Sequence, residues 1–114
     1  FDDCTNLISV IIPEGVEKIS KRAFEDCTQL NSIKLPESVT RIGSEAFINC
    51  TSLTSIEIPG GVTKIGYAAF QDSGLKTVYI TQAAVNNLNN SGGDINAGSD
   101  QTFYGRSGVE IRIT

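Results

Sequence analysis

The sequence contains no histidine, tryptophan or methionine, and these absences exclude several classes of function. Without histidine the chain cannot form Ser-His-Asp or Cys-His catalytic groups, nor the commonest zinc and iron ligand sets. It also shows no paired carboxylates at a recognisable spacing, no glycine-rich phosphate loop and no activated nucleophile. We therefore expect a protein that is not an enzyme and that uses no cofactor.

Positive charge is also scarce, because 9 Lys and Arg stand against 13 Asp and Glu, for a net charge of -4. Nucleic acid is not an expected partner, since phosphate binding requires a concentrated basic surface. Membrane insertion is not expected either, because no apolar run approaches the roughly 20 residues of a membrane span. The sequence shows no signal peptide, but Phe1 begins in the middle of a pattern and there is no Met. We therefore expect a fragment of a longer chain, whose targeting signals would lie elsewhere.

The sequence does contain a 23-residue repeat, which Ala46 to Ala68 shows most clearly. Its pattern is A-F-x-x-C-x-x-L-x-x-I-x-I-P-x-x-V-x-x-I. All 3 Pro, all 3 Cys and 4 of the 5 Phe of the chain follow this spacing. A fixed period of about 20 to 50 residues indicates a solenoid, in which each coil buries its apolar residues only against its neighbours.

Each coil has a shape that follows from local chemistry. Ile56 and Ile58 alternate with period 2 and predict a short strand, which Pro59 ends because it cannot donate to a continuing ladder. The segment 62–65 begins with a β-branched residue and predicts a second short extended arm. We expect Gly43 and its equivalents to bend the chain into a helical or 3₁₀ turn that carries Ala-Phe and leads back to the strand.

The C-terminal third departs from the repeat. We divide a single domain of 114 residues into regular coils over 1–81, an irregular insert over 82–102 and a final coil over 103–114. Thr81 is expected to N-cap a short helix that reaches Leu88. Phe103 is expected to restore the pattern, and the alternating residues 107–114 predict a last strand.

The motif C-x-x-L-x-x-I-x-I/L-P-x-x-V-x-x-I-G-x-x-A-F matches Cys27 to Phe47 and again Cys50 to Phe70. It resembles the leucine-rich repeats of the BspA-like (Treponema pallidum-type) class of bacterial surface proteins. The resemblance implies a right-handed solenoid with a parallel sheet, display on the cell surface or secretion, and adhesion to host matrix proteins or other cells. The substitutions Ser73 and Thr81 and the insert make the resemblance weaker beyond residue 81.

Two sets of repeated residues are expected to form a structural ladder inside the coils: Phe1, Phe24, Phe47, Phe70 and Phe103, and Cys4, Cys27 and Cys50. The cysteines admit a second interpretation as disulfide partners or metal ligands. However, stacked side chains point the same way, and three thiols in a row cannot converge on a tetrahedral metal. We favour a buried thiol ladder that packs as small hydrophobes.

Strand alternation predicts two outward columns on the main sheet, namely Ile11, Lys34, Glu57, Tyr79 and Arg112, and beside it Ser9, Ser32, Ser55 and Thr77. One interpretation is a solvated face on which Lys34 and Glu57 form a weak cross-strand pair. The other is a partner-binding face, because solenoids present variable residues on a continuous surface and Tyr and Arg are common at binding hot spots.

A third column contains the basic residues Lys18, Arg41 and Lys64. Three like charges at the repeat spacing repel one another, although Glu17, Glu37 and Glu45 can lie close enough to offset them. As a site the column could meet an acidic glycan or an acidic protein patch, and otherwise it is a solvated face. The insert also offers oxygen ligands for calcium, but their spacing matches no known loop. They are Asn89, Asn90, Asp94, Asn96 and Asp100.

We expect a module that binds a host or partner protein by non-covalent contact through an exposed solenoid face. The alternative is a structural spacer within a surface protein whose binding site lies elsewhere. Phe1 opens the sequence in the middle of a coil, so we expect an apolar end there. That coil is therefore expected to be frayed, continued by upstream chain, or covered by a second molecule in end-to-end self-association.

Overall fold

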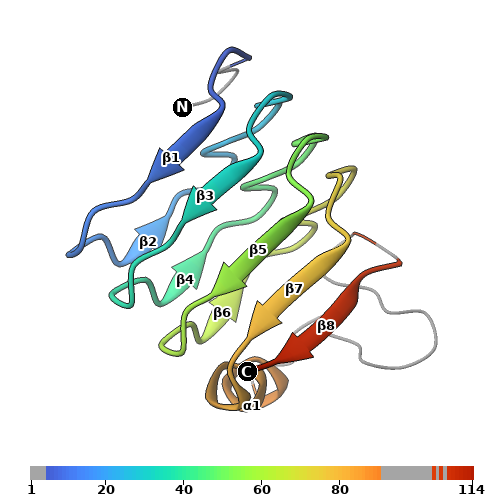
Figure 1. The fold of residues 1–114 in the computed structure, drawn as a ribbon. Helices are drawn as coiled ribbons and strands as arrows, with labels where there is room; N and C mark the ends of the chain where they lie inside the picture. The colour runs from blue at the N-terminus through green and yellow to red at the C-terminus, as the bar shows by residue number, and fades with distance from the viewer. Residues whose placement is uncertain (1–4, 91–103, 105, 107) are drawn as a thin grey trace.

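The computed structural model describes residues 5–90, 104, 106 and 108–114. In Figure 1 the chain winds into a solenoid whose coils each carry a main strand in front and, in the first three, a short second strand behind. All strand pairings are parallel. The predicted leucine-rich-repeat solenoid with a parallel sheet is therefore confirmed.

The main strands follow one another across the front of the molecule: β1 (Ser9–Ile11), β3 (Ser32–Lys34), β5 (Ser55–Ile58), β7 (Thr77–Ile80) and β8 (Glu110–Ile113). β1 pairs with β3, whereas β5, β7 and β8 form a separate hydrogen-bonded sheet. β3 and β5 lie in contact without forming a ladder. The last strand is shorter than the segment 107–114 that alternation predicts.

The second strands form a sheet of their own behind the first, from β2 (Lys18–Ile19), β4 (Arg41–Ile42) and β6 (Lys64–Ile65). After β7, where the next second strand would follow, the chain forms α1 (Gln82–Asn90), which lies against β6. The helix therefore covers β6, the edge strand of this second sheet, whose backbone groups would otherwise be left unpaired.

The helix begins where the sequence predicts. The backbone N–H of Ala84 donates to the Thr81 hydroxyl at 3.2 Å, which confirms Thr81 as the N-cap. Ala84 and Leu88 stand four residues apart on one face, and both are fully buried. The helix thus supplies two apolar side chains to the core in place of the missing β-strand.

The return turns are built differently from the prediction. Isolated hydrogen bonds between residues three apart do occur, as from the Cys27 N–H to the Phe24 carbonyl at 3.2 Å. They do not form an α-helix or a 3₁₀-helix in any of the three turns over residues 20–30, 43–53 and 66–75. The reason is that two residues in each turn have a positive φ, which interrupts a helical path: Arg22 and Asp26, Glu45 and Asn49, and Ala68 and Asp72.

These turns are bonded to the next coil as well as to themselves. The N–H of Phe24 donates to the Ala46 carbonyl at 2.8 Å, and that of Phe47 donates to the Ala69 carbonyl at 2.8 Å. The N–H of Phe70 continues the series to Tyr104 at 3.0 Å. In each case the donor belongs to the earlier coil and the acceptor to the later one.

The core of the solenoid is a stack of aromatic rings. Phe24 and Phe47 lie 5.4 Å apart at an interplanar angle of 5°, and Phe47 and Phe70 lie 5.2 Å apart at 4°. Phe1 and Phe103, expected in the same ladder, lie outside the described residues. The buried aromatic of the final coil is Tyr104, which is 2% exposed and which the repeat pattern does not predict.

The glycines that recur before the turns of this chain allow the coils to approach closely. A Cβ at Gly43 would lie 2.6 Å from the backbone nitrogen of Lys21, and one at Gly66 would lie 2.3 Å from the backbone nitrogen of Ser44. Neither residue has a positive φ. These glycines therefore provide space for the neighbouring backbone, and that they also bend the chain stays a prediction.

Candidate functional site

The outward face of the main strands holds the first predicted column. The strand register places Ile11 opposite Lys34, and it places Tyr79 between Glu57 and Arg112. Ile11 is 78% exposed and Tyr79 is 38% exposed, although both are apolar or aromatic. The neighbouring column has the same register, with Ser9, Ser32 and Ser55 exposed and Thr77 half-buried.

This face is interrupted between β3 and β5. A depression of about 510 Å³ lies there, and Lys34 and Glu57 are both on its wall. Lys34 and Glu57 do not form an ion pair, so the expected cross-strand pair is wrong for these two residues. The physical reason is that β3 and β5 form no ladder, which removes the register that would hold two side chains opposite each other. The other residues of the wall are Glu14, Ile33, Leu35, Pro36 and Glu37.

At the other end of the column, Arg112 already has a partner. Its guanidinium pairs with the Glu110 carboxylate on the same strand. The hydrogen bond and the charge of Glu110 raise the pKa of Arg112 above its usual value. Alternation along β8 puts these two residues on one face, so the sequence held the signal for this pair.

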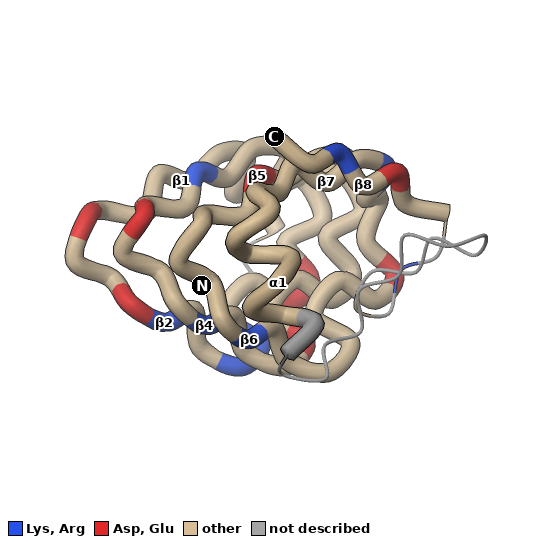
Figure 2. The backbone as a smooth tube through the Cα atoms, turned by 90° about the horizontal axis from the view of Figure 1, so that it is seen from below, with Lys and Arg blue, Asp and Glu red and all other residues tan. Residues whose placement is uncertain are grey.

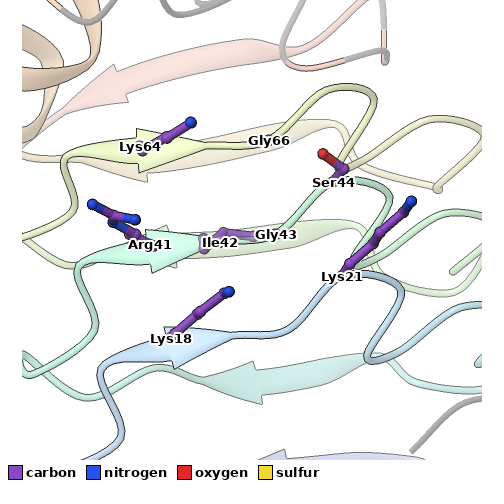
Figure 3. Close-up of a pocket in the computed structure, with 8 residues that line it drawn as sticks. All are labelled: Lys18, Lys21, Arg41, Ile42, Gly43, Ser44, Lys64 and Gly66. Atoms are coloured by element: carbon purple, nitrogen blue, oxygen red, sulfur yellow. The ribbon is translucent and has the colours of Figure 1, made fainter.

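The basic column of Lys18, Arg41 and Lys64 lies on the opposite side of the molecule, on β2, β4 and β6. The register places Lys18 beside Arg41 and Arg41 beside Lys64, and all three side chains are exposed (Figure 3). Lys21, from the turn after β2, adds a fourth cation to a depression of about 230 Å³. Seen from below, basic residues gather at these three strands, and the main strands lie above them (Figure 2).

No carboxylate in the described part of the chain forms an ion pair with these four cations. Glu45, one of the residues expected to offset them, is bound by Arg22 at 3.2 Å instead. Glu17 and Glu37 make no ion pair with the column either. None of the three glutamates therefore forms an ion pair with the column, and a weaker offset at longer range stays a prediction. Like charges directly opposite each other in a sheet are destabilising, so the column opposes folding by a small amount.

Cys27 and Cys50 are free and fully buried, and Cys4 lies outside the described residues. The Cys50 thiol donates to the Phe24 carbonyl at 3.1 Å. Burial, with smaller effects from Cys27 and Asp26, raises the pKa of the Cys50 thiol from 9.0 to about 12. Cys50 is therefore an inert core thiol rather than a reactive one.

Metal binding finds no support in the described residues, which contain no cluster of three or more His, Cys, Asp or Glu able to hold an ion. Of the oxygen ligands considered for calcium, Asn89 and Asn90 end helix α1. Asp94, Asn96 and Asp100 lie outside the described residues. No helix among the described residues is long and apolar enough to cross a membrane.

The first described coil differs from the later ones in its burial. Val16 is only partly buried, whereas Val39 and Val62, at the same position of the following coils, are fully buried. A depression of about 250 Å³ at this end is lined mainly by apolar side chains, Ile12 and Phe24 among them. End-to-end association through this surface stays a prediction.

The comparisons with known proteins agree with the coil geometry. A family model described as BspA type leucine rich repeat region matches residues 1–92 in six copies. No curated protein matches the chain significantly. A crystal structure of a leucine-rich repeat protein from Bacteroides ovatus is similar, with 31% sequence identity and a TM-score of 0.57. The match covers 75% of this chain and 28% of that protein, so the chain spans little more than a quarter of its length. The chain belongs to the BspA-type leucine-rich repeat family.

Proposed function

We propose that this chain is a protein-interaction module of an extracellular, surface-displayed or secreted protein, and that it adheres to a partner protein through the outward face of β1, β3, β5, β7 and β8. The observation that carries the proposal is the contrast between the two faces of these strands. The inward residues Val10, Ile33, Ile56 and Val78 are all aliphatic, whereas the outward ones are Ile11, Lys34, Glu57 and Tyr79. The face therefore varies while its frame repeats, as a recognition surface requires.

The chemistry of this face suits a protein partner. Exposed Ile11 and Tyr79 offer apolar and aromatic contact area, and Arg112 beside Tyr79 adds a charged group. Tyr and Arg supply much of the binding energy in protein interfaces. The depression between β3 and β5 gives the otherwise flat face a place for a protruding side chain, with Lys34 and Glu57 at its wall.

The experiment measures binding of the chain to a panel of purified extracellular-matrix proteins by surface plasmon resonance. Tyr79→Ala and Arg112→Ala should each weaken a saturable interaction by about tenfold, the size expected for a hot spot of moderate strength. Gln29→Ala, at an exposed position in a return turn, is the matched control and should change the affinity less than twofold, the ordinary result for a residue outside the interface.

The competing function is that of a spacer. The stacked rings of Phe24, Phe47 and Phe70 join successive coils into one stiff unit, as a spacer would need. If wild-type protein shows no saturable binding to any member of the panel, the spacer function replaces the adhesive one. Equal weakening by Tyr79→Ala and Gln29→Ala would instead show that the interface does not lie on this face.

A further inference from the structure

The basic surface on β2, β4 and β6 is a second feature, separate from the face assigned to protein binding. Lys18, Arg41 and Lys64 stand in direct register on three neighbouring strands, and Lys21 lies beside them. All four side chains are exposed, and none forms an ion pair within the described residues. We call these four residues the basic strip. Its cations have no structural partner that would explain their alignment.

A second column runs alongside the strip. Lys21, Ser44 and Tyr67 occupy one repeat position in three successive coils, 23 residues apart. Lys21 and Ser44 line the same depression as the strip, and so does Gly66, the residue directly before Tyr67. Tyr67 is 82% exposed, the most exposed of the large hydrophobic side chains in the described structure. An aromatic ring, a hydroxyl and four cations therefore lie at one surface.

This combination identifies the chemistry of a ligand. The unpaired cations require a partner with several negative charges spaced along its length. The Ser44 hydroxyl can exchange hydrogen bonds with hydroxyl groups. The Tyr67 ring is a flat apolar surface with a polar edge, against which the C–H face of a sugar ring can stack. A protein partner fits less well, because apart from the buried Ile42 the depression is lined by glycines, Ser44 and cations rather than by apolar anchors.

Nucleic acid also fits less well. Its affinity depends on many phosphate contacts, and the strip offers four cations on a chain whose net charge is -4. A polysaccharide with anionic groups at intervals needs fewer cations and uses the hydroxyl and the ring as well. We propose that the basic strip, with Ser44 and Tyr67, is a binding site for an anionic polysaccharide that runs across β2, β4 and β6. The site is independent of the protein-binding face on the other side.

The first experiment uses dextran sulfate as the probe, neutral dextran as its uncharged control, and calorimetry at low salt. The combined variant Lys18→Gln, Arg41→Gln, Lys64→Gln should weaken binding by about tenfold or more and reduce the slope of log K against log salt concentration by about three, one unit for each cation removed. The matched control Lys76→Gln, compared with the single variant Arg41→Gln, removes one exposed cation away from both binding surfaces. It should shift the affinity less than twofold. Thermal melts check folding, and the strip variant should melt no lower than wild type, because it removes a repulsion.

The second experiment separates a polysaccharide from other polyanions. Tyr67→Ala should weaken dextran sulfate several-fold and leave inorganic polyphosphate unchanged, because polyphosphate has no ring to stack. Equal losses in Arg41→Gln and its control Lys76→Gln, binding of neutral dextran as strong as that of dextran sulfate, or no effect of Tyr67→Ala would each overturn the proposal. Tighter binding of an oligo-dT strand than of dextran sulfate would overturn it in favour of nucleic acid.

Discussion

The contact between neighbouring coils at Gly66 leads to a quantitative prediction for Gly66→Ala. The added Cβ would lie 2.3 Å from the Ser44 nitrogen and 2.6 Å from the Ser44 Cα. Unstrained contacts between such atoms lie near about 3.5 Å, so the two backbones must separate by roughly 1 Å at this point. Both atoms belong to the backbone, and a change of side-chain rotamer cannot relieve the overlap.

The separation acts on hydrogen bonds as well as on packing. Gly66 donates its N–H to the Ile42 carbonyl at 2.7 Å, and the Tyr67 carbonyl accepts from the Glu45 N–H at 3.0 Å. Overpacking costs about 1 to 3 kcal/mol, and each weakened bond adds about 0.5 to 1.5 kcal/mol. We therefore expect Gly66→Ala to lower the free energy of unfolding by about 2 to 6 kcal/mol.

Urea unfolding followed by circular dichroism measures this difference, with Gly60→Ala as the control. A Cβ at Gly60 would meet only the Thr81 hydroxyl at 3.4 Å, which is ordinary contact with a side chain, and Gly60 has no positive φ. Gly60→Ala should leave stability within about 1 kcal/mol of wild type and can raise it by reducing the entropy of the unfolded chain. Equal effects of the two substitutions would refute the idea that glycine sets the distance between coils.

Two further predictions concern the core thiol and the helix cap. Because burial holds the pKa of Cys50 at about 12, only ~1 thiol in 10⁴ is ionised at pH 8, and the native protein should react with iodoacetamide far more slowly than the urea-unfolded protein. Rapid labelling of native Cys50 would contradict its burial. The folded-state pKa of this thiol lies above the unfolded value of 9.0. The stability that the thiol contributes is therefore complete below pH 9 and is lost as the pH rises towards about 12. Thr81→Ala removes the N-cap of α1 and should lower the free energy of unfolding by about 0.5 to 2 kcal/mol, measured by urea titration. Gln82→Ala removes only an exposed side-chain hydrogen bond to Asn86 and serves as the control. It should lower the free energy of unfolding by about 0.2 to 0.5 kcal/mol.

The repeat predicts the frame because identical residues recur in identical surroundings. Ile56, Ile58 and Val62 are buried as their alternation and spacing require. The return turns could not be predicted from the same information, since residues three apart suit a helical turn and a non-helical one equally well. Each turn contains two residues with positive φ, and because Arg22, Glu45 and Ala68 are among them, residue type does not mark these positions in the sequence.

For the candidate sites, the repeat predicts which side chains share a column but leaves their pairing undetermined. Arg22 pairs with Glu45, which occupies the same repeat position one coil later, whereas the register places Arg41 between Lys18 and Lys64. The interruption between β3 and β5 also has no sequence signal, because it depends on how whole coils stack. Tyr67 is different. Tyr67 follows Ser44 by 23 residues and Lys21 by 46, which the sequence shows, and an aromatic at a polar position of the repeat is a signal for binding.

The hydrogen bonds between return turns give the solenoid a direction. In every bond of the series, from Phe24, Phe47 and Phe70, the N–H points towards the C-terminal end and the carbonyl towards the N-terminal end. Other bonds between coils run the opposite way, as from the Gly66 N–H to the Ile42 carbonyl, so this polarity belongs to the series and not to the ends as a whole. A second copy that extended this series could attach only head to tail. Repetition of such a contact produces an open filament rather than a closed symmetric dimer.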